Sequence, residues 1–119
     1  MDLAIAERTV GRVTVLDLAG RLTVDHGADR IKDKVNSLIA QGRTQIVLNL
    51  KDVPYIDSGG LGQLVASFGS VKKAAGSLKL LNVNSRNHDL LSITRLVTIF
   101  DSFDSEAEAV ESFPALARE

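Results

Sequence analysis

The chain has 119 residues, of which 45% are hydrophobic and 24% charged, and this composition is typical of one soluble globular domain over residues 1–119. Fourteen basic and fifteen acidic residues give a formal charge of -1, and 4% of the residues are aromatic, so neither a basic surface nor stacked rings favour direct contact with nucleic acid. The absence of cysteine excludes disulfides, thiolate zinc sites and cysteine nucleophiles.

The N-terminal part of the chain predicts a β-hairpin followed by a helix. Residues 3–8 and 13–18 have the composition of strands, and Gly11 marks the turn between them. Apolar residues then recur at helical spacing over residues 28–39. The preceding segment, residues 23–26, is rich in side chains that cap helices, so we expect this helix to be capped from there.

The middle of the chain predicts strand, helix and strand in turn. Residues 45–50 form an apolar run of strand type, which Pro54 interrupts. A second amphipathic pattern covers residues 61–71 and ends before Gly76. Residues 78–83 are again typical of a strand.

The C-terminal part predicts two further helices around a last strand. Ser85 can cap a short helix that ends near residue 91, and residues 97–100 predict the strand. Ser105 and Glu108 have the spacing of a capping box ahead of the final helix.

Strands that alternate with helices indicate an α/β domain whose strands are joined by parallel crossovers. We therefore expect one mostly parallel sheet of about five strands, with an antiparallel strand at its N-terminal edge and about four helices. Loops that follow parallel strands gather at the carboxyl edge of the sheet. The loop at residues 21–26 and the loop before Ser58 should accordingly be adjacent.

The sequence gives no sign of export or of membrane insertion. Its first residues lack both a basic start and a long apolar run, so we expect no signal peptide. No stretch approaches the roughly 20 apolar residues that cross a bilayer. The expected location is the cytoplasm, without contact to a membrane.

The segment Asp57-Ser58-Gly59-Gly60-Leu61-Gly62 is the candidate functional motif. Asp57 or Ser58 can accept a hydrogen bond from the free N–H groups of the helix start. Gly59 and Gly60 leave that turn bare, so that another molecule can approach closely. Two interpretations remain open on the residues alone: a capped helix with a tight turn, or a serine that receives a phosphate.

The chain resembles the STAS-domain family, and specifically the bacterial anti-sigma factor antagonists, over roughly residues 3–113. The family pattern is Asp-Ser-(Ser or Thr)-Gly-Leu-Gly after a strand of the type Ile-Val-Leu-Asn-Leu, here residues 57–62 after residues 46–50. Residues 18–23 match the family's Leu-x-Gly-x-Leu at the end of an earlier strand. The sequence departs from the pattern at Gly59, where the family has a hydroxyl residue.

The resemblance implies a protein-binding module that regulates transcription by partner switching and is not an enzyme. Ser58 is then the phosphorylated residue. The implied partners are an anti-sigma factor that acts as a serine kinase, with ATP bound by that partner, and a serine phosphatase; no cofactor belongs to the chain itself. The expected partner-binding residues are Asp25, Asp57, Ser58, Gly59, Gly60 and Leu61. Helix capping is an equal interpretation for Asp25, and core packing is the simpler one for Leu61.

Enzymatic alternatives find less support in the residues. A serine hydrolase that uses Ser58 needs a histidine base, for which only His26 and His88 exist, and two histidines without cysteine match no standard metal spacing. Asp57 as an acyl-phosphate acceptor would need an acidic cluster at the end of the first strands, which is missing. No phosphate-binding glycine loop for ATP is present. We therefore expect no catalytic residue and no metal.

A closer alternative shares the same fold. STAS-like domains also serve as scaffolds that are not phosphorylated, as subunits of lipid-transport assemblies, or as parts of anion transporters. The last role requires membrane spans, which this sequence lacks.

Overall fold

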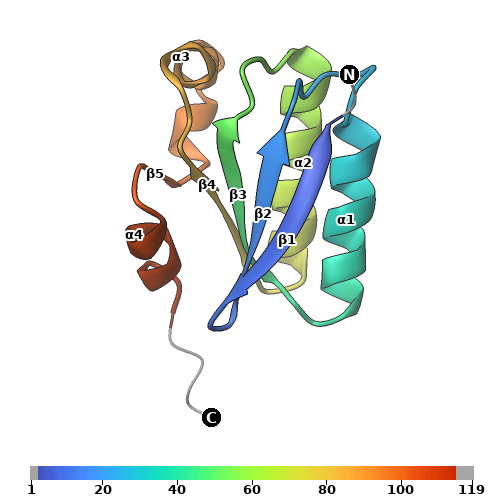
Figure 1. The fold of residues 1–119 in the computed structure, drawn as a ribbon, viewed down its shortest axis with the longest axis vertical. Helices are drawn as coiled ribbons and strands as arrows, with labels where there is room; N and C mark the ends of the chain where they lie inside the picture. The colour runs from blue at the N-terminus through green and yellow to red at the C-terminus, as the bar shows by residue number, and fades with distance from the viewer. Residues whose placement is uncertain (1–2, 115–119) are drawn as a thin grey trace.

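The computed structural model describes residues 3–114, which form a mixed five-stranded sheet in the order β1-β2-β3-β4-β5 (Figure 1). β1 pairs with β2 in antiparallel fashion, and every other neighbouring pair is parallel. The strands are β1 (Ala4–Val10), β2 (Val13–Ala19), β3 (Gln45–Asp52), β4 (Ser77–Leu81) and β5 (Ser102–Phe103).

Within residues 3–114 the helices are α1 (Ala28–Ala40), α2 (Ser58–Lys73), α3 (Ser85–Ile93), the 3-10 helix η1 (Leu96–Thr98) and, after the last strand, α4 (Glu106–Glu111). α1 and α2 cover one face of the sheet, whereas α4 lies on the other (Figure 1). The predicted fold class is confirmed: an α/β sheet that is parallel except for its N-terminal edge strand. No helix within residues 3–114 is long and apolar enough to cross a bilayer.

Alternation along the strands divides the core between the two faces of the sheet. Leu16 and Leu48 point toward α1 and α2, where they join the larger buried cluster. Their neighbours Val15 and Val47 point the other way and pack with Ala109 of α4 in a smaller one. Both clusters are buried, so these central strands read as continuous apolar runs.

The last strand lies later in the chain than predicted. The strand expected at residues 97–100 is wrong: after α3 ends at Ile93, Arg95 adopts left-handed backbone (φ 65°) and the chain continues into η1. Val97 and Ile99 remain 37% and 39% exposed, and only Phe100 enters the core, where its ring meets Phe68 edge to face at 5.3 Å. The apolar composition of this segment therefore reflects one buried aromatic anchor instead of a strand.

The expected capping of α1 from residues 23–26 is also wrong. The N-cap residue is Gly27, which adopts a left-handed backbone with a φ of 93°. Because glycine has no side chain, no side-chain hydrogen bond caps the start of the helix. Thr23 and His26 instead close a tight turn of their own through backbone hydrogen bonds of 2.8 and 3.0 Å. The Thr23 hydroxyl accepts from the backbone N–H of His26 at 3.1 Å, so it is not available to α1.

The β2–α1 loop and the β3–α2 loop join at the carboxyl edge of the sheet, as predicted. Leu22 and Ile56 form an isolated parallel bridge. The N–H of Leu22 donates to the carbonyl of Tyr55 at 3.0 Å, and the N–H of Asp57 donates to the carbonyl of Leu22 at 3.2 Å. These bonds extend the β2–β3 pairing into the loops and fix the start of α2.

Gly60 makes this junction sterically possible. A Cβ atom built on Gly60 would overlap the carbonyl oxygen of Leu22, which is backbone and is itself held by a hydrogen bond. Two positions later in the same helix, a Cβ on Gly62 meets no atom within 4 Å. Steric contact therefore requires glycine at position 60 but not at position 62.

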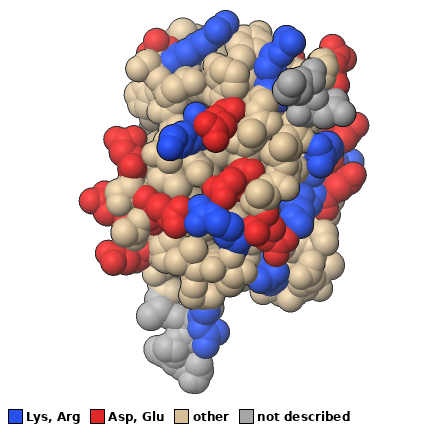
Figure 2. Space-filling model, in the orientation of Figure 1, with Lys and Arg blue, Asp and Glu red and all other residues tan. Residues whose placement is uncertain are grey.

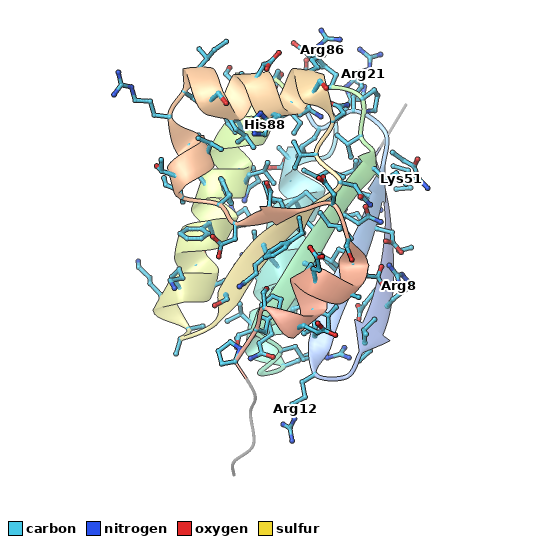
Figure 3. The ribbon with its side chains drawn as sticks, turned by 90° about the vertical axis from the view of Figure 1, so that its left-hand side faces the viewer. Arg8, Arg12, Arg21, Lys51, Arg86 and His88 are labelled. Carbon is cyan, nitrogen blue, oxygen red and sulfur yellow. The ribbon has the colours of Figure 1, made fainter. Side chains whose placement is uncertain are left out.

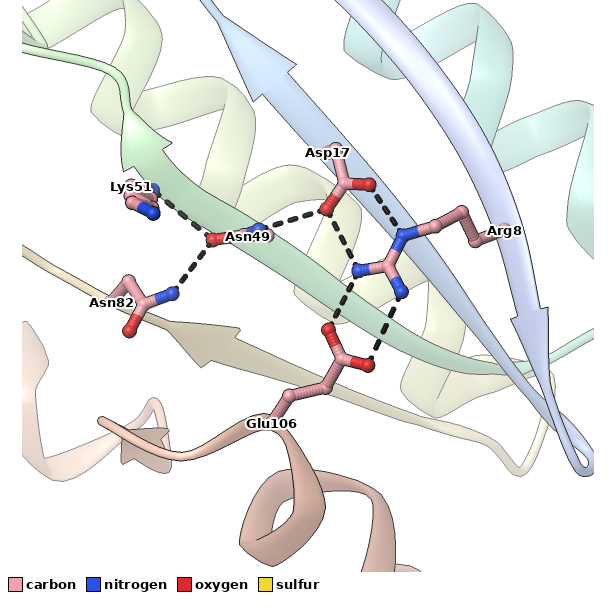
Figure 4. A network of polar contacts seen from close by, with 6 residues as sticks. All are labelled: Arg8, Asp17, Asn49, Lys51, Asn82 and Glu106. Carbon is pink, nitrogen blue, oxygen red and sulfur yellow. Dashed lines mark hydrogen bonds and ion pairs between the residues drawn. The ribbon is translucent and has the colours of Figure 1, made fainter.

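The open part of the second sheet face carries a polar network that ties α4 to β1, here called the Arg8 clasp (Figure 4). The Arg8 guanidinium binds Asp17 on β2 at 2.5 and 3.0 Å, and Glu106 at the start of α4 at 2.6 and 3.2 Å. Asn49 donates to Asp17 at 2.8 Å and accepts from Asn82 at 3.1 Å, which extends the network over β3. Elsewhere on the face drawn in Figure 2, acidic and basic side chains are interspersed, in keeping with the small net charge.

Replacing Gly60 with alanine should destabilise the protein, whereas the same change at Gly62 should not. The added methyl group at position 60 forces the loop backbone apart, and we expect a loss of about 2 kcal/mol in the free energy of unfolding. At position 62 alanine adds helix propensity, worth up to about 1 kcal/mol. Urea unfolding of Gly60→Ala and Gly62→Ala measures both; equal effects would contradict the steric account of Gly60.

The Arg8 clasp should contribute stability that depends on pH. Hydrogen bonds from Arg8 are the largest cause that holds the pKa of Asp17 and Glu106 below the usual values of these carboxyls. Groups with a lowered folded-state pKa stabilise the fold above their unfolded pKa of about 4, and this contribution is lost as the pH falls through the folded-state value. Because the side chains are partly exposed, we expect Arg8→Gln to cost about 1 kcal/mol at pH 7.

Denaturant unfolding of wild type and Arg8→Gln at pH 7 and at pH 3 checks this dependence. The difference between the two proteins should shrink at pH 3. Arg12→Gln is the matched control, because Arg12 is exposed at the hairpin turn and forms no ion pair within residues 3–114. A loss of equal size at both pH values would show that Arg8 acts through packing alone.

Candidate functional site

Asp57 organises the junction that presents Ser58. Its backbone is extended, and its Oδ1 accepts the N–H of Gly60 at 2.7 Å, which caps the first turn of α2. Both carboxylate oxygens also accept the backbone N–H of Val24 in the β2–α1 loop, at 3.2 Å each. Asp57 is therefore the N-cap, and the sequence alternative in which Ser58 caps the helix is not needed.

Ser58 is the first residue of α2 and is exposed. Within residues 3–114 its hydroxyl has no hydrogen-bond partner, because the capping role belongs to Asp57. The helix start consequently keeps its geometry without the serine side chain. A hydroxyl that is exposed, unengaged and held on a fixed backbone is available for chemistry supplied by another molecule.

Gly59 lies directly beneath the side chain of Val24. A Cβ on Gly59 would come within 2.5 Å of Val24 Cβ and 3.0 Å of its Cα. Val24 is 65% exposed, so it stands beside Ser58 as an apolar side chain at the surface. This packing gives a physical reason for glycine where the family pattern has a serine or threonine.

The remaining predicted partner-binding residues differ in how accessible they are. Asp25 is exposed on the turn between Thr23 and His26, but the residue of this loop that contacts Asp57 is Val24, through its backbone. Gly60 is buried, and Leu61 is 6% exposed in the main core. The core interpretation of Leu61 agrees with the structure. Both residues are packed inside the domain beneath the surface that presents Ser58.

α3 forms the second wall of the site, a feature that the sequence analysis missed. Asn84 caps this helix by accepting the N–H of Asn87 at 2.8 Å, so the expected cap Ser85 is instead the first helical residue. The side-chain amides of Asn84 and Asn87 donate to the carbonyl of Val53, at 3.3 and 3.0 Å. The spacing Asn-x-x-Asn at a helix start was the available signal, although it does not identify a carbonyl more than 30 residues away.

A groove of about 440 Å³ separates α3 from the β3–α2 loop. Ser58 lines it together with Tyr55, Ile56, Asp57, Arg86, Asn87, Asp89, Leu90 and Ile93. The Arg86 guanidinium lies over the Tyr55 ring, with Cζ 4.6 Å from the ring centre. Ile93 is 80% exposed at the edge of the groove, so the site combines a hydroxyl, one cation, two carboxylates and apolar surface.

The arrangement does not support the enzymatic alternatives. His26 Nδ1 lies 3.4 Å from the Thr23 hydroxyl, and within the described part of the chain no hydrogen bond joins His26 to Ser58. Residues 3–114 also contain no group of three or more histidine, aspartate or glutamate side chains placed to hold a metal ion. Within residues 3–114 the geometry presents the Ser58 hydroxyl without a histidine in hydrogen-bond contact with it.

Comparison with known proteins identifies the family. The sequence pattern of the STAS domain matches residues 4–109. An anti-sigma-B factor antagonist of Bacillus subtilis (strain 168) is 42% identical over 86 residues, which are 72% of this chain and 77% of the relative. An anti-sigma F factor antagonist of Paenibacillus polymyxa is 28% identical over 111 residues, 92% of this chain and 94% of the relative.

Solved structures share the fold over nearly the whole chain. The anti-sigma factor antagonist SpoIIAA in its unphosphorylated form has a TM-score of 0.70 at 26% identity, covering 91% of this chain and 96% of the other. The phosphorylated form of SpoIIAA, a Bacillus cell fate determinant, has a TM-score of 0.71 at the same identity, covering 91% and 97%. The chain therefore belongs to the STAS domain family, in which the anti-sigma factor antagonists are regulatory binding proteins and not enzymes.

Proposed function

We propose that this protein is an anti-sigma factor antagonist that binds an anti-sigma factor with serine kinase activity and is released when that kinase phosphorylates Ser58. One observation carries the proposal: Asp57 caps α2, so the exposed Ser58 hydroxyl is free on a backbone that does not depend on it. The relatives named as antagonists, and a SpoIIAA structure in the phosphorylated form, support the same assignment. Such a regulator of transcription acts in the cytoplasm.

In the proposed reaction the chain is the substrate and the partner holds ATP. Ser58 Oγ attacks the γ-phosphorus, the bond from that phosphorus to the β,γ-bridging oxygen breaks, and ADP leaves with the electron pair. The hydroxyl proton passes to a base of the partner. A serine phosphatase later directs water at the phosphorus, which returns the serine hydroxyl and releases inorganic phosphate.

The proposed docking surface is centred on the exposed residues around the groove. Ser58 and Asp25 are exposed and Gly59 is half-buried beneath Val24, while Asp57 joins the two loops through its hydrogen bonds. Gly60 and Leu61 act indirectly, because they are buried. The same surface includes the exposed apolar side chains of Val24 and Ile93, which a partner would cover.

Phosphorylation should weaken docking without unfolding the protein. A phosphate adds about -1.5 to -2 charge at pH 7, and at a helix N-terminus that charge is tolerated locally. The loss of affinity then arises between the molecules, where the dianion must be desolvated against apolar surface and like charges. About 2.8 kcal/mol of such a penalty corresponds to a hundredfold loss of affinity.

Ser58→Ala should abolish phosphorylation by the cognate kinase and ATP. Intact-mass measurement is expected to show one added phosphate on the wild type and none on the variant. Ser85→Ala is the matched control, since Ser85 is also an exposed first residue of a helix behind a side-chain N-cap. An unmodified wild type would favour the scaffold that is not phosphorylated, and a phosphate on Ser58→Ala would assign the acceptor to another residue.

Phosphorylated protein should keep its fold and bind the kinase at least about a hundredfold more weakly. Amide spectra of the two forms are expected to coincide except in the β2–α1 and β3–α2 loops and in α3. Calorimetric titration with the kinase gives the affinities. Global spectral collapse, or equal affinities for both forms, would rule out the switch as proposed.

A further inference from the structure

The groove beside Ser58 contains a single basic side chain, and that side chain has no acidic partner. Arg86 is the second residue of α3 and is exposed; its guanidinium rests on the Tyr55 ring, 4.6 Å from the ring centre. Within residues 3–114 it forms no ion pair. A cation–π contact at an exposed position is weak, so the guanidinium is available to a stronger ligand.

We propose that Arg86 receives the phosphate of phosphorylated Ser58. The guanidinium would leave the Tyr55 ring and donate a pair of hydrogen bonds to two phosphate oxygens across the groove. Arginine suits this role because its planar fork of N–H groups matches two oxygens of one phosphate and remains charged at every physiological pH. This inference rests on the proposed phosphorylation of Ser58.

Hydrogen bonds hold both walls of the groove in place. Asn84 and Asn87 hold the start of α3 to the carbonyl of Val53, and Asp57 holds the other wall to Val24. Only the Arg86 side chain has to change its rotamer. Its new position would bridge α3 and α2 over the groove, so that the phosphorylated protein covers part of its own docking surface.

Asp89 limits the strength of this contact. It lines the same groove, one turn after Arg86, and its carboxylate repels a phosphate there. Arg86 and Asp89 should therefore act in opposite directions on the phosphate. The carboxylate of Asp57, which lines the groove beside Ser58, acts on the phosphate in the same direction as Asp89.

The test uses full-length protein with phosphoserine installed at position 58 through an expanded genetic code, so that no kinase is required. Titration of the ³¹P signal gives the second pKa of the phosphate. Arg86→Gln should raise this pKa by about 0.5 pH unit, a threefold change in proton affinity, because the nearby cation is removed. Asp89→Asn should lower it.

Arg12→Gln is the matched control, since Arg12 lies at the opposite end of the molecule from Arg86 (Figure 3). It should leave the phosphate pKa unchanged. Identical titrations of the wild-type and Arg86→Gln proteins would overturn the proposal. So would a change of equal size in Arg12→Gln, which would reveal only long-range charge.

Tyr55 provides a second readout that a merely structural role of Arg86 would not move. It is the only tyrosine, and the chain has no tryptophan, so its ring signals are assigned without ambiguity. Phosphoserine at position 58 should shift the Tyr55 ring resonances more in protein that carries Arg86 than in Arg86→Gln, because only the former loses the contact between guanidinium and ring. If the kinase leaves Ser58 unmodified but the installed phosphoserine produces these shifts, the proposed function is wrong while the groove still binds phosphate. If the kinase modifies Ser58 but the shifts do not depend on Arg86, only the proposed role of Arg86 is wrong.

Discussion

The carboxylate of Asp57 is the interaction on which the site depends, because it joins two loops that are 33 residues apart in the sequence. One side chain accepts the N–H of Gly60, which starts α2, and the N–H of Val24, which fixes the loop after β2. Neither donor has another hydrogen-bond partner within residues 3–114. Since Asp57 accepts both hydrogen bonds, the side chain of the neighbouring Ser58 is not needed to hold the start of the helix. The separation of the structural carboxylate from the chemical hydroxyl allows the serine to be modified while the helix start stays in place.

Close backbone packing follows from the same junction and explains the local sequence. Leu22 lies so near the first turn of α2 that only glycine fits at position 60, and Val24 covers position 59 in the same way. The departure from the family pattern at Gly59 is therefore linked to an apolar, exposed Val24 in the opposite loop. A hydroxyl side chain at position 59 would require this valine to move. The surface offered to a partner thus has a methyl-bearing side chain next to Ser58 in place of a second hydroxyl.

The sequence was sufficient to predict those features that depend on local periodicity and on the geometry of parallel crossovers. It indicated the order of elements, the antiparallel edge strand, and the contact between the loops at residues 21–26 and before Ser58. It misplaced the last strand, since the apolar residues near Phe100 serve one aromatic contact with Phe68. It also missed the contacts whose partners are distant in the chain. Arg8 and Glu106 are 98 residues apart, and Asn87 binds a carbonyl 34 residues away; no spacing rule connects such pairs.

The positions of these distant contacts bear on how the protein can be regulated. The Arg8 clasp holds α4 on one face of the sheet, and the asparagine pair of α3 holds the wall of the groove at its carboxyl edge. Each side of Ser58 is therefore anchored by hydrogen bonds that do not involve the serine. If Ser58 is phosphorylated as proposed, these hydrogen bonds oppose a rearrangement of the fold, and the phosphate would act through charge, hydration and nearby side chains. Arg86, which rests on Tyr55 without an ion pair in the described residues, is the basic side chain in the groove that would respond to it.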